Sequence, residues 1–285
     1  MQPLTFLRPV LYTVFLWWFV TGLVMVPYGR SPHLKRLWFA GATLILGAAF
    51  AGLLFASRRA DPLHVYLAVT CGIAIWGWHT ASYYFGYVTG PKLPARPQPR
   101  GLAARFRRAL RASLYHELAI LACALLLAAV TWSAPNRWGL WMFLALWLMH
   151  LSSKLNIFLG VRNFYIEFLP AHLHSLKPLL GRQPTNGFMP VAVVLATSIT
   201  LLLIYRAIAP GTPPADAIGR LLVSTMLSLG ILEHVLLVAP LPATLWGWQI
   251  RPLPQTHDAE TAVSLRQPNT PLHPLPKCIS ESEAA

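Results

Sequence analysis

Charged side chains are scarce in this sequence: only 11% of its 285 residues are Asp, Glu, Lys or Arg. Soluble domains average about 25% charged residues. With 55% hydrophobic residues and a mean hydropathy of +0.52, the chain has too little polar surface to cover a water-soluble globule. The shortage of charge excludes an ordinary soluble domain and indicates a membrane protein.

Cysteine and the common catalytic signatures are also scarce. The three cysteines, Cys71, Cys123 and Cys278, do not form a C-x-x-C pair and are too few for a disulfide framework. The sequence has no P-loop, no nucleophile elbow, no G-x-G-x-x-G and no H-E-x-x-H. We therefore expect no catalytic residues and no metal site.

Long apolar runs dominate the sequence instead. A hydrocarbon core of about 30 Å takes about 20 helical residues to cross. Runs of that length predict seven transmembrane helices, near 9–27, 37–57, 63–89, 112–132, 137–159, 188–208 and 220–240. The runs lack the alternation of barrel strands, so the prediction is an all-α, polytopic membrane fold whose first helix is retained rather than cleaved.

The distribution of positive charge predicts the orientation. Lys and Arg accumulate in cytoplasmic loops. Of the 23 Lys and Arg residues, 17 follow the first, third, fifth and seventh runs or lie at their ends. This places the N-terminus in the periplasm and the C-terminus in the cytoplasm. Because topology accounts for the net charge of +14, we expect contact with the lipid bilayer and no binding of nucleic acid.

Two polar segments complete the predicted organisation. Residues 1–248 form the transmembrane domain, with a basic interfacial loop at 90–111. From Gly101 onward, Leu102, Phe106 and Leu110 recur every four residues among arginines, which predicts a helix on the membrane surface; a solvated loop is the open alternative. Residues 249–285 are polar and rich in proline, and we predict a disordered cytoplasmic tail.

Ionisable and amide side chains interrupt four of the apolar runs. Such residues are costly in a membrane and are functional candidates by default. Under the predicted topology all of them fall in the cytoplasmic half and form one intramembrane polar layer; they are His79, His116, Glu117, His150, Lys154, Asn156, Glu233 and His234. His150 and Lys154 are four residues apart and share a helix face. Arg162, Asn163 and Glu167 follow the fifth run and are predicted at the interface.

The residues leave three uses of this layer open. In a structural interpretation, Lys154 pairs with Glu117 or Glu233 and fixes helix packing. In a pigment interpretation, the neutral imidazole of His79 or His150 is an axial ligand to a macrocycle. A metal site is the weakest interpretation, because the helical ligand spacings are missing and Lys154 repels a cation.

Several of these stretches carry a resemblance to a known family. They are FLWWFVTGL, WGWHTASYYFGYVTGP, LYHELAI, NRWGLWMFLALWLMHLSSKLNIFLGVRN, EFLPAHL, and EHVLLVAPLP followed by LWGW, which together span most of residues 1–250. In them the sequence resembles the PuhE-like photosynthetic complex assembly proteins of purple bacteria.

The resemblance implies a multi-pass protein of the bacterial inner membrane, including its intracytoplasmic photosynthetic part. Such a protein is not an enzyme and helps to assemble the photosynthetic reaction centre and its core light-harvesting complex, whose subunits are the expected partners. An influence on bacteriochlorophyll supply is a further expectation, with transient bacteriochlorophyll as the one cofactor considered. The alternative is a tetrapyrrole pigment-binding carrier or membrane enzyme that uses the polar layer.

Overall fold

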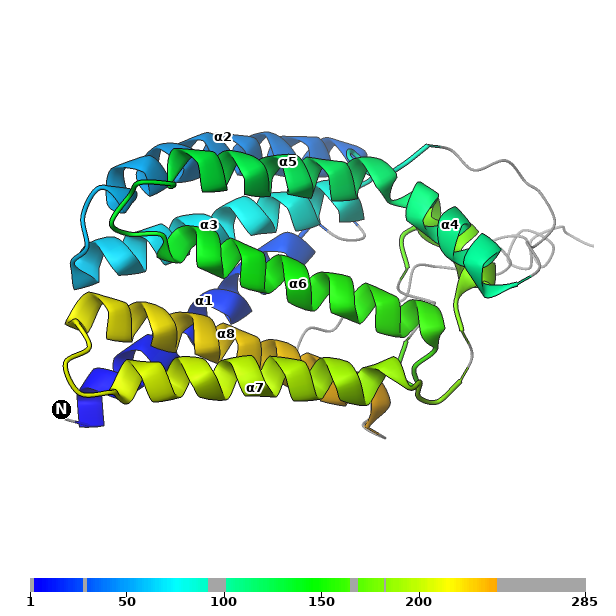
Figure 1. Ribbon diagram of the computed structural model, residues 1–285. Coiled ribbons are helices and arrows are strands. Elements are labelled where there is room, and N and C mark those ends of the chain that lie inside the picture. Colours follow the sequence, from blue (N-terminus) through cyan, green and yellow to red (C-terminus); the bar gives the residue numbers. More distant parts are fainter. Residues whose placement is uncertain (1–2, 28–29, 92–100, 165–168, 182, 240–285) are drawn as a thin grey trace, which may run out of the picture. The chain divides into compact units, whose positions relative to one another are not determined.

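Helices make up all the regular structure in the described part of the chain. The computed structural model describes residues 3–27, 30–91, 101–164, 169–181 and 183–239 (Figure 1). The α-helices are α1 (Pro3–Met25), α2 (Pro32–Ser57), α3 (Pro62–Tyr84), α4 (Leu102–Ala112), α5 (Leu114–Val130), α6 (Trp138–Leu159), α7 (Phe188–Ile208) and α8 (Pro214–Val238), and η2 (Ala171–Leu179) is a 3-10 helix. The predicted all-α class is confirmed for these residues. The predicted tail at 249–285 lies outside them.

The helix bounds follow the apolar runs, with differences at the polar ends. α7 coincides with its predicted range, and α6 differs from its range by one residue. α2 and α8 begin five and six residues before the predicted starts, because each begins with a proline at the first turn and continues through a polar turn. α3 ends at Tyr84, five residues early, just before Gly86 takes a φ of 81°. The apolar runs therefore locate the helices to within about six residues, with α2 and α8 extending beyond their runs and α3 ending inside its run.

The basic segment after residue 100 is helical, as its periodicity predicts. Gly101, with a φ of 87°, precedes α4, and α4 meets α5 at an angle of 68°. Leu102, Phe106 and Leu110 are 58%, 43% and 42% exposed. The α4 helix therefore turns away from the direction of α5 and leaves its apolar face largely uncovered. Its position at a membrane surface stays a prediction.

Among the described helices, five are each long and apolar enough to cross a membrane: α1, α2, α6, α7 and α8. The bent pair α4 and α5 makes a sixth if it forms one crossing. α3 is long enough but less apolar, and 13 of its 23 residues are buried in the protein. Large apolar side chains on α2 and α7, such as Leu44 (78% exposed) and Val194 (65% exposed), point outward. These surfaces indicate a multi-pass membrane protein in contact with lipid.

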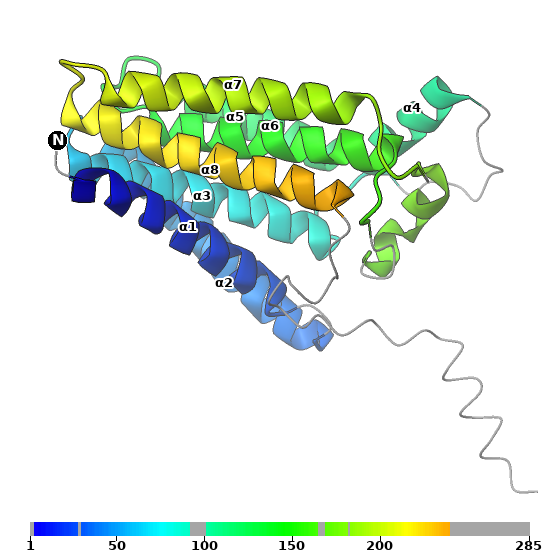
Figure 2. The same ribbon diagram turned by 90° about the horizontal axis from the view of Figure 1, so that it is seen from below.

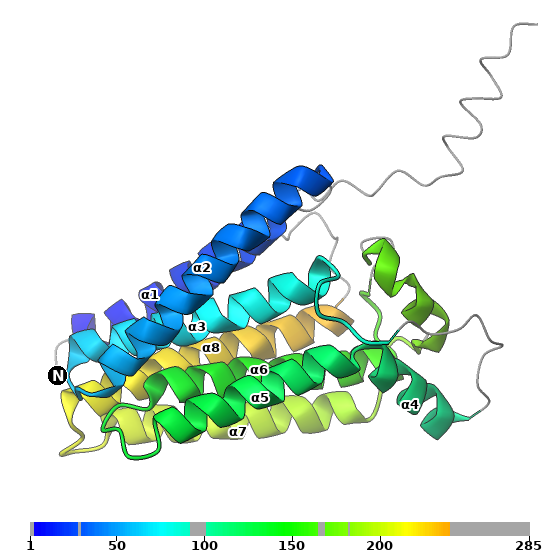
Figure 3. The ribbon, with the colours of Figure 1, turned by 90° about the horizontal axis from the view of Figure 1, so that it is seen from above.

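α3 occupies the centre of the helical bundle. One buried apolar cluster joins α3 to α2, α5 and α6, and a second joins it to α6 and α8. At Gly72 an added Cβ would lie 2.5 Å from the carbonyl oxygen of Gly139, so the backbones of α3 and α6 are in direct contact. α1 and α2 are inclined to the other long helices (Figures 2 and 3).

One end of the bundle carries the irregular elements. α3, α6 and α8 all run toward the end where α4 and η2 lie (Figure 1), and α4 and η2 contact each other there. Arg105 of α4 donates two hydrogen bonds to the carbonyl oxygen of Leu179, from Nε at 3.2 Å and from Nη2 at 2.6 Å. This end brings the last turns of α3 and α6 together with the first turn of α5.

Candidate functional site

An ion pair between two helices forms the centre of the candidate site. Nζ of Lys154 on α6 lies 2.7 Å from Oε1 of Glu117 on α5. The Lys154 nitrogen also lies 4.4 Å from the centroid of the Tyr83 ring on α3, a cation–π distance. The lysine side chain is 25% exposed and the glutamate side chain 15%. Of the two acids considered for Lys154, the structure selects Glu117.

Three imidazoles lie around this pair on α3, α5 and α6. The His116 ring is 4.4 Å from the Tyr83 ring and 6.1 Å from the His150 ring, and His150 is 5.3 Å from Trp76. His79 is 5% exposed and packs against Phe143. Nδ1 of His79, Nδ1 of His116 and Nε2 of His150 are buried without a hydrogen-bond partner. Buried polar atoms are normally paired, and of these three histidines only His150 lines a cavity from which a bound molecule could supply the partner.

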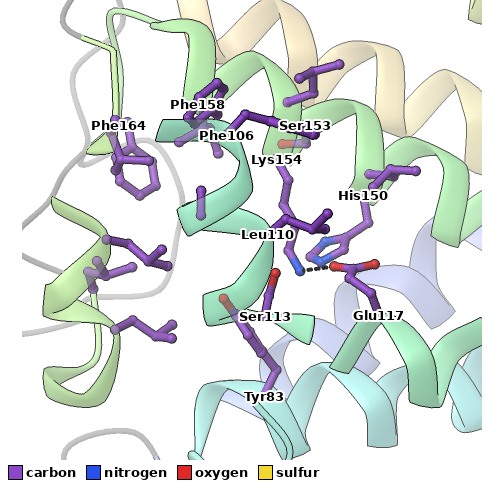
Figure 4. Close-up of a pocket in the computed structure, with 18 of the residues that line it drawn as sticks. Tyr83, Phe106, Leu110, Ser113, Glu117, His150, Ser153, Lys154, Phe158 and Phe164 are labelled. Atoms are coloured by element: carbon purple, nitrogen blue, oxygen red, sulfur yellow. Dashed lines mark hydrogen bonds and ion pairs between the residues drawn. The ribbon is translucent and has the colours of Figure 1, made fainter. Parts of the chain in front are cut away.

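A cavity of about 380 Å³ opens beside the ion pair (Figure 4). Its polar end is lined by Tyr83, Ser113, Glu117, His150, Ser153 and Lys154. Its walls are apolar and come from α4, α6, η2 and the segments next to η2, with Phe106, Leu110, Leu151, Leu155, Ile157, Phe158, Phe164, Leu169, Leu173, Leu176 and Leu180. The volume lies within the range of small-molecule sites, about 300–1,000 Å³. His150 and Lys154 both face this cavity, as their spacing predicts.

The remaining intramembrane candidates make other contacts. His234 on α8 donates through Nδ1 to the carbonyl of Gly230 at 2.8 Å and accepts the Ser152 hydroxyl at Nε2 at 2.9 Å. Asn156 on α6 is fully buried and donates to the carbonyl of Ser152 at 3.1 Å. Both nitrogens of His234 are therefore engaged, Nδ1 within α8 and Nε2 with Ser152 of α6. His234 thus joins α8 to α6, the Asn156 side chain bonds within α6, and neither residue lines the cavity.

Glu233, next to His234 in the sequence, faces a different direction. It lines a second cavity of about 280 Å³ between α1, α3, α6 and α8, and it accepts a hydrogen bond from the Trp17 side chain. Tyr84, His150 and Ser153 line this cavity as well as the first one. The predicted single layer therefore consists of two cavities that share part of their lining, together with the seam between α6 and α8.

The predicted interfacial residues follow α6. Arg162 is exposed. Asn163 donates through Nδ2 to the carbonyls of Leu236, at 2.8 Å, and Ala239, and its backbone N–H donates to Leu237 at 2.9 Å. It thereby satisfies carbonyl groups that the end of α8 leaves without helical partners. Glu167 lies outside the described residues.

η2 contributes a docking contact that the sequence did not reveal. Nε2 of His172 donates to the carbonyl of Tyr83 at 3.0 Å, and its ring lies against Gly86. Burial lowers the pKa of His172 below its usual value, which favours the neutral imidazole. The sequence signal for this element is its repeated leucines, Leu173, Leu176 and Leu179. In the structure Leu173 and Leu176 form a cavity wall.

The site can hold an apolar molecule with a hydrogen-bonding group. Within the described ranges, no three His, Cys, Asp or Glu side chains are grouped closely enough to hold a metal ion. Of the two histidines considered for a pigment, His150 borders both cavities with Nε2 unpaired, whereas His79 borders neither. A macrocycle in either cavity would therefore contact His150, whereas side chains that cover His79 would have to move before a macrocycle could contact that residue.

Comparison with known proteins places the chain among related sequences. A family described as "protein of unknown function (DUF3623)" matches residues 4–257. The "uncharacterized 30.4 kDa protein in puhA 5'region" of Rhodobacter capsulatus is 32% identical over 262 residues, which cover 88% of this chain and 92% of that protein. No solved structure matches the chain.

Proposed function

The chain belongs to the DUF3623 family, and we propose that it is an integral membrane assembly factor for the photosynthetic reaction centre and its core light-harvesting complex. The observation that carries this proposal is the relative in Rhodobacter capsulatus, which is named for its place in the 5' region of puhA and covers nearly the whole chain. That genetic position points to a role connected with photosynthesis. It agrees with the resemblance of the apolar stretches to the PuhE-like proteins.

The geometry supports a role in holding a partner. A transient holder needs a surface that is unfilled in the free protein. The cavity beside Lys154 and Glu117 has apolar walls from α4 and η2 and an unpaired nitrogen of His150 at its polar end. An apolar segment of a reaction-centre or antenna subunit would bury the exposed face of α4, including Phe106 and Leu110. Influence on bacteriochlorophyll supply would be a secondary effect of this role.

We also propose seven crossings of the inner membrane, with a periplasmic N-terminus and a cytoplasmic C-terminus. α3 is 23 residues, about 35 Å, long and lies alongside α6, which supports counting it as a crossing despite its lower apolar content. The bent pair α4 and α5 then forms one further crossing. Alkaline phosphatase and green fluorescent protein fused to each terminus test this; activity of the same reporter at both termini would contradict the odd number.

The assembly role is tested by deleting the gene and restoring it as wild type, Lys154→Ala or Arg107→Ala. Arg107 is an exposed cation on α4 and serves as the control. The absorption bands of the reaction centre and core antenna in membranes are the measure, with immunoblots for the level of this protein. We expect deletion and Lys154→Ala to lower both bands while Arg107→Ala restores them. An unchanged photocomplex yield in the deletion strain would refute the proposal.

A tetrapyrrole carrier or membrane enzyme is the second candidate, and the unpaired Nε2 of His150 favours it. Imidazole is a common axial ligand to macrocyclic metals. For this candidate, protein purified in mild detergent should carry a stoichiometric pigment band. His150→Leu should remove the band, whereas His79→Leu should retain it because His79 borders neither cavity. Co-purified reaction-centre subunits without pigment would favour the assembly role alone.

A further inference from the structure

The second cavity contains a carboxylate that has no cation beside it in the described structure. Glu233 is the only Asp, Glu, Lys or Arg side chain among the described residues that line this cavity of about 280 Å³. The nearby Lys154 is engaged by Glu117, 2.7 Å away, at the other cavity. A carboxylate within a membrane bundle is costly unless it is paired. In a chain with a net charge of +14, the described lining of this pocket holds one acidic side chain and no Lys or Arg.

Aromatic side chains surround the same space. Trp17 from α1 and Trp76 and Tyr84 from α3 line the cavity together with Glu233. The side chain of Trp17 donates a hydrogen bond to Glu233, which holds the carboxylate at the cavity wall. Aromatic faces attract cations within about 6 Å, and tryptophan does so most strongly. Aromatic rings with one carboxylate form the kind of site that recognises substituted ammonium groups.

A metal ion fits this cavity poorly. Among the described lining residues, Glu233 and His150 are the only His, Cys, Asp or Glu side chains, and the rest of the wall is largely aromatic and aliphatic. Zinc takes four ligands, and calcium takes six or more oxygens. An organic ammonium needs one counter-charge and apolar or aromatic contact for its methyl or methylene groups. The lining supplies that combination.

We propose that the cavity between α1, α3, α6 and α8 binds an organic ammonium group, which pairs with Glu233 and contacts the rings of Trp17, Trp76 and Tyr84. Glu233 lies five residues before the end of α8, about 8 Å along the axis. At that depth the cavity is within reach of a zwitterionic lipid headgroup or of a small soluble amine. The binding is a property of the cavity and does not depend on the role in photosynthesis.

Choline and 3,3-dimethylbutan-1-ol provide a matched pair of probes. The two molecules have nearly the same shape, but the alcohol replaces the trimethylammonium group with an uncharged tert-butyl group. Full-length protein purified in a non-ionic maltoside detergent is titrated with each probe, with sodium chloride matching the salt. Thermal unfolding is the measure, since a ligand that binds the folded state raises the melting temperature in a saturable way. We expect a saturable rise with choline and none with the alcohol.

Two amide variants on α8 locate the site. Glu233→Gln removes the charge and keeps the shape, and we expect it to weaken choline binding by at least about tenfold. Asp216→Asn makes the same chemical change in the first turn of the same helix, far from the cavity, and should leave binding unchanged. Trp17→Phe should weaken binding less than Glu233→Gln, because an aromatic face remains. A far-ultraviolet circular dichroism spectrum for each variant verifies that it is folded.

The outcomes separate the proposal from its alternatives. Equal responses to choline and to its uncharged analogue would overturn the proposal, and so would choline binding that survives in folded Glu233→Gln. The source of the ammonium is then found by competition with lysophosphatidylcholine, lysophosphatidylethanolamine and lysophosphatidylglycerol in mixed micelles. Displacement of choline by the first two alone assigns the site to a bilayer headgroup. Retention of choline in all three assigns the site to a soluble amine.

Discussion

The ion pair between Lys154 and Glu117 leads to the sharpest prediction about stability. At the observed N–O distance of 2.7 Å and an effective dielectric of about 20, the Coulomb attraction is about 6 kcal/mol. Desolvation of both groups offsets much of that attraction. Removing one partner leaves the other charge buried and unpaired, which typically costs about 3–5 kcal/mol. Since the two side chains are 25% and 15% exposed, we expect about 3 kcal/mol, at the lower end.

The measurement is a double-mutant cycle of Lys154→Met, Glu117→Gln and the combined variant. Unfolding is driven by sodium dodecyl sulfate in mixed micelles and followed by circular dichroism. Each single variant should lower the free energy of unfolding by about 3 kcal/mol, and the combined variant by no more than a single one, because both charges are then absent. Arg107→Met removes an exposed cation from α4 and should change the stability by less than about 0.5 kcal/mol.

Additivity would refute this reasoning. If the combined variant loses the sum of the two single losses, the groups do not depend on each other and the pair contributes no coupling. Single variants within about 0.5 kcal/mol of wild type would show that water reaches both charges in the unpaired state. Either result would show that the ion pair does not fix α5 against α6 at this end of the bundle.

Three further predictions concern the packing and docking of single elements. Gly72→Ala should destabilise the protein by about 2 kcal/mol or more in the same detergent assay, because its Cβ would lie 2.5 Å from the Gly139 carbonyl, whereas Gly47→Ala, with open space, should be tolerated. Asn163→Ala should cost about 1–2 kcal/mol and speed hydrogen exchange in the last turn of α8, whose carbonyls it leaves unpaired. Burial lowers the pKa of His172 below 6.5, so the undocked form of η2 binds protons more readily than the docked form. The sensitivity of η2 to proteolysis should therefore rise as the pH falls from 7.5 to 5.5. His172→Gln should remove this pH dependence.

Much of the helical architecture could be predicted because a membrane imposes few alternatives. An apolar run of about 20 residues has to pair its backbone groups internally, so α6 and α7 follow directly from composition. The face shared by His150 and Lys154 follows from the helical repeat, and both line the same cavity. The start of α4 after Gly101 follows from the spacing of its leucines and phenylalanine.

Features that depend on which helices are neighbours could not be predicted. The sequence offered both Glu117 and Glu233 as partners for Lys154. Lys154 pairs with Glu117 because α5 packs beside this face of α6. The helical repeat separates adjacent residues by about 100°, yet it does not tell which neighbour each one meets. Glu233 faces a cavity and His234 faces Ser152 for that reason. α3 is less apolar than the other long helices because other helices, and not lipid, surround most of it.

The three residues that border both cavities make the two spaces thermodynamically dependent. Tyr84, His150 and Ser153 present one side to each cavity, so a guest that shifts any of them on one side alters the shape of the opposite chamber. By thermodynamic linkage, if one guest changes the affinity for the second by some factor, the second changes the affinity for the first by the same factor. A molecule that binds near Glu233 and moves one of these residues would therefore change the affinity of the space beside Lys154 for its own guest.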